Sequence, residues 1–187
     1  MFGLAPVDAI YMDYAATTPV APEVMATMQA ALADFGNPSS SHAWGAQADA
    51  HVDAAAAALG AALGVASDTL VWTSGATESD NLAIMGAARY RAARGKHVIT
   101  SRTEHKAVID ACKQLEREGF EITWLTPEAD GRVTPGALAA ALRDDTVLVS
   151  LKWVNNEIGT INDIPALAAD VAEHDALFHV DAAQAFG

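Results

Sequence analysis

Apolar residues follow Pro22 at the spacing of an amphipathic helix, and Gly36 ends their run. Pro22 suits the first helical position, where its missing N–H is not needed. A polar, turn-rich segment over residues 36–42 leads into a second predicted helix, Gly45–Leu63, whose alanines have the highest helix propensity. The apolar positions of the first helix are Val24, Met25, Met28, Ala31, Leu32 and Phe35.

Further along, short runs of β-branched and apolar residues alternate with helical patterns. The predicted strands are Thr69–Thr73, His97–Ser101, Glu121–Leu125, Thr146–Leu151 and Leu177–Val180. The predicted helices between them are Glu78–Arg94, His105–Glu118, Thr134–Arg143 and Asp163–His174. This alternation is typical of an α/β fold with a mostly parallel sheet flanked by helices. The sequence shows no internal repeat and no low-complexity linker.

Length and charge narrow the class of protein. A chain of 187 residues, 51% of them hydrophobic, can bury one substantial core. The formal net charge of -13 disfavours nucleic acids and anionic membranes as partners. Met1–Ala16 has no basic segment of the secretory type, so a cytoplasmic location is expected. The longest apolar stretch, Ala54–Ala66, is too short to span a bilayer and is interpreted as a buried helix.

Cys112 is the single cysteine, which excludes an intramolecular disulfide and disfavours a metal site. No metal is expected.

The chain ends at Gly187, directly after a predicted strand, where a parallel sheet is expected to continue into another crossover.

Candidate chemistry lies where the predicted strands end, because open parallel sheets bind ligands outside the carboxyl ends of their strands. Residues 74–78, Ser-Gly-Ala-Thr-Glu, follow the first predicted strand and open a helix. Their free N–H groups could hold a phosphate. Ordinary N-capping by Ser74 or Thr77 explains the motif equally well. Glu78 and Asp80 suit the helix dipole but are expected to point away from a phosphate.

Polar groups also follow three later strands. His105 could stack on a flat aromatic ligand, although a lone histidine is more often structural. The amides of Asn155 and Asn156 could donate to a phenolate or carboxylate, or could form a turn. Asp181 ends the last strand, where an unpaired carboxylate is costly. Pyridoxal phosphate presents a phosphate, an aromatic ring, a phenolic oxygen and a protonated ring nitrogen, so it would use all of these groups at once. A carboxylate such as Asp181 beside the ring nitrogen keeps that nitrogen protonated, and the charged ring then acts as an electron sink.

The motifs resemble those of the cysteine desulfurases, which have the class V aminotransferase-like fold. The resemblance extends over nearly the whole of this chain and corresponds to the N-terminal half of such an enzyme. They are Tyr11-Met-Asp-Tyr-Ala-Ala-Thr-Thr-Pro19, Asn37-Pro-Ser-Ser-Ser-His42, Thr73-Ser-Gly-Ala-Thr-Glu-Ser-Asp-Asn-Leu-Ala-Ile84, Thr103-Glu-His-Lys-Ala-Val108, Val154-Asn-Asn-Glu-Ile-Gly159 and His179-Val-Asp-Ala-Ala-Gln184.

The resemblance implies a role for each matching residue toward pyridoxal 5'-phosphate. Ala76 and Thr77 would hold its phosphate, and His105 would stack on its ring and transfer protons. Asn156 and Gln184 would reach its phenolic oxygen, and Asp181 would pair with its nitrogen. The cofactor-binding set is thus Ala76, Thr77, His105, Asn156, Asp181 and Gln184, with His105 and Asp181 also catalytic.

The resemblance also implies an activity. L-cysteine becomes L-alanine, and the sulfur leaves as an enzyme persulfide for iron–sulfur cluster assembly and thiolation. A homodimer and a sulfur-acceptor or scaffold protein are the expected partners. The fold would be the large domain of a type I aminotransferase, over residues 16–187, with residues 1–15 belonging to a small domain completed downstream. In the family the Schiff-base lysine and the persulfide cysteine come later than Gly187, so these 187 residues alone are expected to be inactive.

Two alternative functions stay open. A selenocysteine lyase or kynureninase-like enzyme of the same fold would share the cofactor contacts, although residues 104–106 and 155–157 favour the desulfurase. A non-catalytic truncated paralogue would keep the fold without the chemistry.

The nucleophiles within the chain do not replace the missing ones. Cys112 lies on an apolar helical position and is interpreted as a buried structural cysteine. Lys106 is interpreted as a surface lysine. Lys152 departs from the family's wording and could approach the cofactor, but strand alternation could equally send it to solvent. The basic residues Arg89, Arg91, Arg94 and Lys96 could form a docking patch for a partner, but they are assigned to the negative end of their helix. Trp72 and Trp124 are assigned to the core.

Overall fold

The computed structural model describes residues 9–186. They fall into two compact units, one ending at Trp72 and the other beginning at Thr73. Residues 1–8 of the segment assigned to a small domain lie outside the described residues.

The first unit is helical, as predicted. It contains α1 (Pro22–Ala31), α2 (Ala43–Leu63) and a short 3-10 helix, η1 (Ser67–Thr69). The chain leaves the helical conformation after Ala31 in a turn, so α1 is shorter than the apolar pattern indicated. His42 caps α2, since its Nδ1 accepts from the N–H of Gly45, and Gly64 ends α2 in the left-handed conformation (φ 70°).

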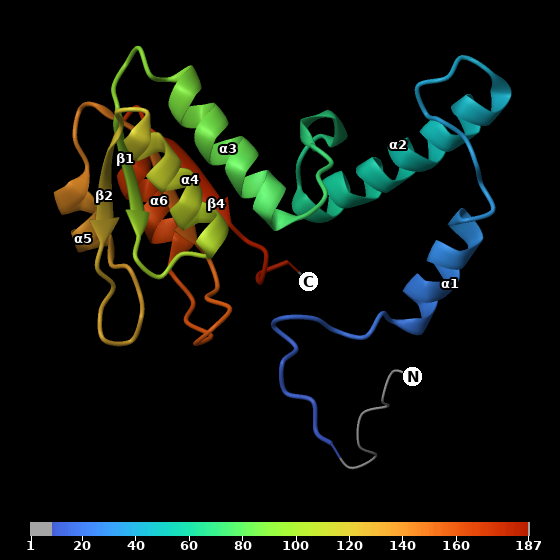
Figure 1. The fold of residues 1–187 in the computed structure, drawn as a ribbon, viewed down its shortest axis with the longest axis horizontal. Coiled ribbons are helices and arrows are strands. Elements are labelled where there is room, and N and C mark those ends of the chain that lie inside the picture. Colours follow the sequence, from blue (N-terminus) through green and yellow to red (C-terminus); the bar gives the residue numbers. More distant parts are fainter. Residues whose placement is uncertain (1–8, 187) are drawn as a thin grey trace. The chain divides into compact units, whose positions relative to one another are not determined.

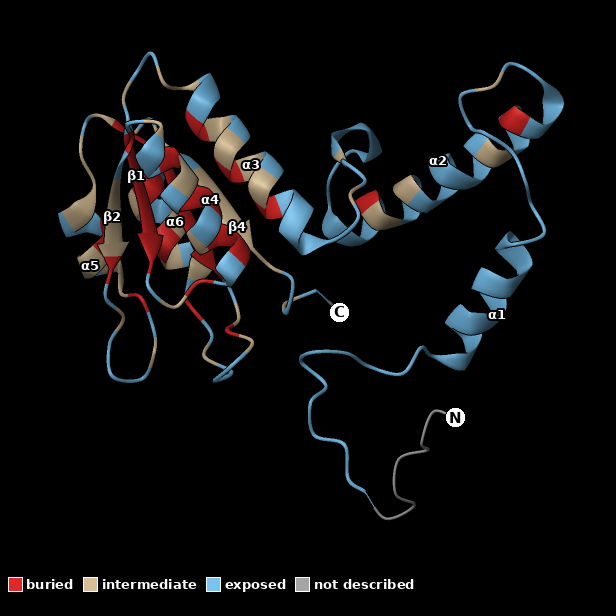
Figure 2. Ribbon diagram, viewed as in Figure 1, coloured by how far each residue is buried: buried red, intermediate tan, exposed pale blue. Residues whose placement is uncertain are grey.

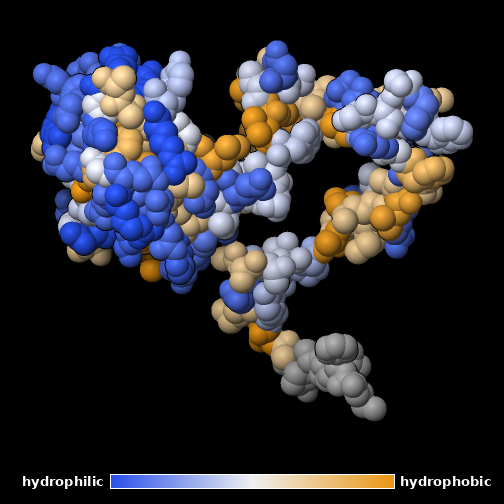
Figure 3. Space-filling model, turned by 45° about the horizontal axis from the view of Figure 1, so that its top comes forward, coloured by the Kyte–Doolittle hydropathy of each residue, from blue (hydrophilic) through white to orange (hydrophobic). Residues whose placement is uncertain are grey.

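Large apolar side chains stay exposed in the first unit. The expectation of a buried helix over Ala54–Ala66 is wrong, because most of this stretch is exposed on α2, which packs mainly against η1. Hydrophobic residues are drawn as orange surface in Figure 3. The exposed apolar residues of α1 and the turns around it are Val20, Val24, Met25, Met28, Leu32 and Phe35.

The second unit is a parallel sheet with helices between its strands (Figure 1). The strands β1 (His97–Ser101), β2 (Glu121–Leu125), β3 (Thr146–Lys152) and β4 (Leu177–Asp181) are arranged in the order β2-β1-β3-β4 and are all parallel. The helices are α3 (Ala76–Tyr90), α4 (Lys106–Arg117), α5 (Pro135–Ala141) and α6 (Ile164–Ala172). The predicted α/β class with a parallel sheet is confirmed.

Two layers of helices cover the sheet and bury it on both faces. Under α3 and α4 lies a core that includes Val98 of β1 and Leu148 of β3. The opposite face packs on α5 and α6 through Ile99, Val149 and Leu151. Consecutive strand residues therefore enter different cores, as a pleated strand requires, and the strands β1 and β3 are buried along their whole length (Figure 2).

The predicted strand Thr69–Thr73 is wrong. Thr69 ends η1, and Leu70–Thr73 pairs with no strand of the sheet, because strand propensity forms a strand only where a neighbour can take its hydrogen bonds. Trp72, assigned to the core, is 56% exposed. Trp124 is half-buried in β2 and packs against the core under α3 and α4, and its indole N–H donates to Glu116.

Arg89 lies in the last turn of α3, as expected, and the basic residues at this end of the helix also bind carboxylates. Arg89 pairs with Glu118 at 2.7 Å, while Arg91 and Arg94 both pair with Asp175. These contacts tie α3 to the end of α4 and to the turn that precedes β4. Among the described residues, no helix is long and apolar enough to cross a membrane.

The strand order creates a switch point between β1 and β3. The chain leaves β1 through α4 on one face and leaves β3 through α6 on the other, so the segments that follow these neighbouring strands diverge. In doubly wound sheets such a point opens a crevice outside the carboxyl ends of the strands. The fold therefore places the candidate site beyond Ser101 and Lys152.

Candidate functional site

The N-terminus of α3 forms the first part of the site. Gly75 caps the helix at φ 155° and ψ 178°, a conformation that only glycine adopts readily. Ala76 and Thr77 follow in the first turn, where backbone N–H groups have no intrahelical acceptor. Glu78 turns back to accept from the N–H and hydroxyl of Ser74, at 2.7 and 2.6 Å. The amides of Ala76 and Thr77 can therefore donate to an anion.

The loop after β1 carries His105. This residue is the N-cap of α4, and its Nδ1 accepts from the N–H of Ala107 at 3.2 Å. The neutral ring therefore carries its proton on Nε2. The ring is exposed at the carboxyl edge of the sheet, the position at which the sequence placed it.

The loop after β3 is held by Asn155, whose buried side chain makes three hydrogen bonds. Its Nδ2 donates to the carbonyl of Thr103 at 3.2 Å, which joins the loops that follow β1 and β3. Its Oδ1 accepts from the N–H groups of Glu157 and Ile158. The neighbouring Asn156 is the residue predicted to contact the cofactor. The structure assigns to Asn155 the turn-forming role that was the alternative for this loop.

Asp181 ends β4 at the same carboxyl edge of the sheet. Its Oδ1 accepts from the N–H of Ala183 at 3.0 Å, and its backbone carbonyl accepts from the N–H of Trp153. The half-buried carboxylate therefore keeps one oxygen for another partner. Gln184 lies three residues on, exposed in the turn that follows β4.

A buried polar layer lies beneath α3, behind these residues. His179 Nδ1 is 2.9 Å from the hydroxyl of Ser150, and His179 Nε2 is 3.6 Å from the Asp80 carboxylate. Burial raises the pKa of Asp80 to about 6, the nearby Asp181 adds to the rise, and Lys152 opposes it. Burial also lowers the pKa of His179. This layer was not predicted from the sequence, because Asp80 was assigned only to the helix dipole.

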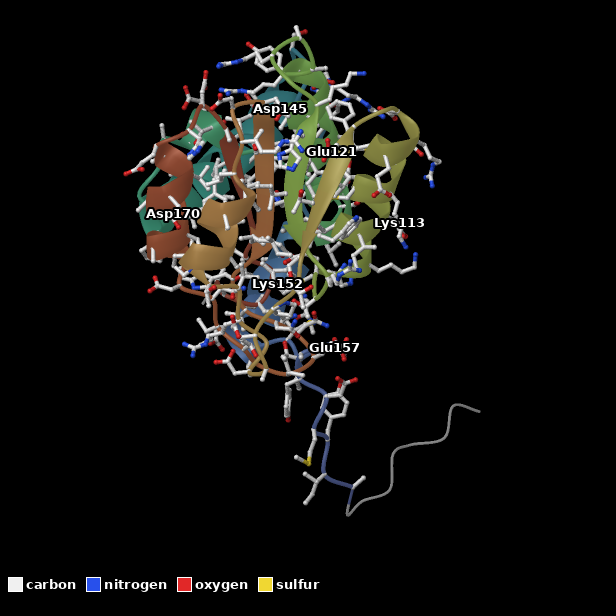
Figure 4. The ribbon with its side chains drawn as sticks, turned by 90° about the vertical axis from the view of Figure 1, so that its left-hand side faces the viewer. Lys113, Glu121, Asp145, Lys152, Glu157 and Asp170 are labelled. Atoms are coloured by element: carbon white, nitrogen blue, oxygen red, sulfur yellow. The ribbon has the colours of Figure 1, made fainter. Side chains whose placement is uncertain are left out.

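Lys152 is the largest departure from the sequence-based expectation. Only 3% of the residue is exposed, and its Nζ donates to Asn156 Oδ1 at 3.0 Å, so the solvent-facing alternative is wrong. Figure 4 shows Lys152 and Glu157 at the end of the sheet where the strands finish, and Glu121 and Asp145 at the opposite end. The alternation of β3 gave the signal, since it places Lys152 on the same face as Ser150.

Glu104 is buried next to this cluster. Its removal from water raises its pKa to about 8, and the charges of Asp181 and Asp80 act in the same direction. Cys112 is fully buried as expected, and burial raises its pKa to about 12, which leaves it as an unreactive thiol. Lys106 is a surface residue as expected and pairs with Asp110. The described residues contain no cluster of side chains that could hold a metal ion.

The resulting arrangement offers amide donors for an anion, an imidazole, a carboxamide and a carboxylate around one end of a parallel sheet. Of the residues named from sequence, Ala76, Thr77, His105, Asn156 and Asp181 belong to elements that begin or end at this edge. Their contacts with a ligand stay predictions, as does the contact of Gln184.

The family model described as "Aminotransferase class-V" matches residues 10–187. The cysteine desulfurase IscS of Pseudomonas aeruginosa strain UCBPP-PA14 is 54% identical over 182 residues, which are 95% of this chain and 45% of that protein. The IscS of Azotobacter vinelandii is 53% identical with the same coverage. The chain thus spans about half the length of the curated relatives it matches.

Solved structures agree with this family. The structure titled "SspA in complex with cysteine" matches with a TM-score of 0.90 and 41% identity, over 94% of this chain and 51% of that one. DndA from Streptomyces lividans matches with a TM-score of 0.82 and 42% identity, over 94% of this chain and 50% of that one. The resemblance drawn from the sequence motifs is confirmed, and so is the expected aminotransferase fold. This chain belongs to the class-V aminotransferase family, whose enzymes depend on pyridoxal phosphate.

Proposed function

We propose that this chain is the cofactor-binding half of a cysteine desulfurase, which converts L-cysteine to L-alanine and passes the sulfur on as an enzyme persulfide. The observation that carries the proposal is the meeting of the α3 N-terminus, His105, Asn156 and Asp181 at the carboxyl edge of one parallel sheet. The names of the IscS relatives support the same activity.

The donor set fits pyridoxal phosphate. The N–H groups of Ala76 and Thr77 suit a phosphate, because they add the helix dipole to free hydrogen-bond donors. Asp181 suits a protonated ring nitrogen, and the amides of Asn156 and Gln184 suit a phenolic oxygen. When bound, the cofactor would supply a protonated ring that withdraws electrons from the substrate.

The chain's own residues then have separate tasks. Asp181 would pair with the ring nitrogen and favour its protonated form. His105 would stack on the ring and leave its Nε2–H free to donate a hydrogen bond, since Nδ1 accepts from the N–H of Ala107. Asn155 keeps the loop that carries Asn156 attached to the loop that carries His105.

The remaining parts of the proposal concern the whole protein. The proposed enzyme is a cytoplasmic homodimer that hands sulfur to an iron–sulfur scaffold or another acceptor protein. Residues 16–187 would form most of its large domain, with residues 1–15 in a small domain. The formal charge of -13 supports a partner other than nucleic acid or an anionic membrane.

The test uses the complete product of the gene that encodes this chain. Purified protein is given L-cysteine and a thiol reductant, and the alanine and sulfide formed are measured. We expect equal amounts of both products. Asp181→Asn, which cannot hold the ring proton, is expected to lower kcat by at least about a hundredfold, the range over which general acid–base groups act.

The matched control is Asp144→Asn, which removes the same charge at an exposed position before β3, at the other end of the sheet. It is expected to leave kcat unchanged. Absence of alanine formation by the wild-type protein would refute the desulfurase, and equal activity of Asp181→Asn would refute the role of Asp181.

A further inference from the structure

The side chain of Lys152 is held where lysine rarely occurs. Fully buried lysines are uncommon unless an acceptor or a charge compensates them. Lys152 is 3% exposed, and one of its three N–H donors reaches Asn156 Oδ1 at 3.0 Å. Its backbone carbonyl accepts from the Asn162 side chain at 2.8 Å. The end of β3 is therefore fixed on both its backbone and its side chain.

Acidic residues surround the Lys152 side chain. Lys152 pairs in register with Asp181 on β4, so both side chains leave the same face of the sheet on neighbouring strands. Lys152 also lowers the pKa of Asp80 and of Glu104, which shows that its charge acts on both acids. One buried cation thus compensates the acidic groups behind the crevice.

The partners of Asn156 settle which way its amide points. A lysine ammonium only donates, so the atom that faces Lys152 must be Oδ1. A carboxylate only accepts, so the atom that faces Glu157 Oε1 at 2.9 Å must be Nδ2. Lys152 and Glu157 therefore favour the same orientation of the Asn156 amide. Nδ2 keeps a second hydrogen, which is free to donate to a ligand.

We propose that Lys152 is a positioning residue that prepares the cofactor site by holding the Asn156 amide with its N–H donor facing the crevice. The inference rests on the proposed function. An amide turned the other way would present Oδ1, an acceptor, to the phenolic oxygen of the cofactor and would repel it. Lys152, together with the exposed Glu157, disfavours this wrong orientation before the cofactor arrives.

The first test measures binding of pyridoxal phosphate to the cofactor-free form of the complete gene product, followed by quenching of its tryptophan fluorescence. Lys152→Met keeps an unbranched side chain that is one atom shorter and removes its N–H donors. We expect the Kd to rise about tenfold, the size of one well-placed hydrogen bond. Lys113→Met, which removes an exposed lysine on α4, is the control and is expected to leave the Kd unchanged. An unchanged Kd in Lys152→Met overturns the inference.

A double substitution tests whether Lys152 acts through Asn156. In protein that carries Asn156→Ala, Lys152→Met is expected to cause no further rise in Kd, because the amide to be oriented is gone. A further rise of about tenfold would show that the lysine acts by another route and would overturn the inference.

A second variant covers the case in which Lys152→Met does not fold. Asn156→Asp has the same shape and still accepts from Lys152, but it has no N–H to offer the cofactor. The inference predicts a rise in Kd of about tenfold for this variant as well. Binding as tight as that of the wild type overturns it.

The last readout needs no cofactor. In cofactor-free protein labelled with ¹⁵N-asparagine, the Asn156 side-chain N–H signals are expected to form one sharp pair. They are expected to broaden or shift in Lys152→Met and to stay unchanged in Lys113→Met. Unchanged signals in Lys152→Met overturn the inference. A wild-type protein that binds no pyridoxal phosphate would instead refute the proposed function, and these signals would still decide the role of Lys152.

Discussion

At the scale of single residues, burial decides which acidic groups behind the crevice carry a charge. Glu104 is 6% exposed, and its pKa of about 8 lies well above the usual 4.5 of a glutamate. At neutral pH its carboxyl group is therefore mostly protonated.

This raised pKa predicts how stability depends on pH. The folded protein holds a proton on Glu104 that the unfolded chain releases above pH 4.5, so the stability that this proton provides is lost as the pH rises toward about 8. Glu104→Gln mimics the protonated acid. Its free energy of unfolding, relative to wild type, is expected to increase between about pH 5 and about pH 8.

Urea denaturation at both pH values measures this difference. Glu173→Gln, at an exposed position after α6, is the control and is expected to follow the wild type at both. A relative stability of Glu104→Gln that is the same at both pH values would show that Glu104 is ionised in the folded state.

At the scale of elements, the start of β1 depends on a close approach of two backbone segments. Any Cβ at Gly95 would overlap the backbone carbonyl group of Asp145, which precedes β3. The contact lies between backbone atoms, so no side chain can move away to relieve it. Glycine at this position allows β1 and β3 to begin side by side.

Gly95→Ala is therefore expected to destabilise the protein by about 2 kcal/mol, as overpacking typically does. The control is Gly136→Ala in α5, where a new Cβ would meet no atom within 4 Å. This control is expected to raise stability by about 0.5 kcal/mol or more, because alanine favours the helix. Chemical denaturation of the two variants measures both values, and equal stabilities would contradict the overlap at Gly95.

Local pattern predicted most of the elements but not every one of them. His97–Ser101 and Glu121–Leu125 are strands with the predicted bounds, because β-branched and apolar residues there also find neighbouring strands. Leu70–Thr73 has the same kind of pattern and forms no strand, since pairing depends on residues distant in sequence. Strand alternation places Lys152 on the same face as Ser150, but its burial could not be predicted from this, because it depends on α3 and α4 covering that face.

At the scale of the whole molecule, the described chain leaves much apolar surface uncovered, especially around α1 and α2. Leu32 and Phe35 are 85% and 76% exposed. Apolar surface of this extent marks a site of association or a tendency to aggregate. The 187-residue chain by itself is therefore expected to self-associate, and size-exclusion chromatography with light scattering at micromolar concentration measures this. A sharp monomeric peak would contradict it.

The central claim is that this half of the protein supplies the contacts to pyridoxal phosphate while its own lysines form no covalent bond to it. The most direct test incubates the complete gene product with pyridoxal phosphate, reduces it with borohydride and maps any trapped lysine by peptide mass spectrometry, with Asp181→Ala as comparison. We expect trapping to depend on Asp181, with Lys96, Lys106, Lys113 and Lys152 all unmodified. Stoichiometric trapping on Lys152, or equal trapping in Asp181→Ala, would contradict the account.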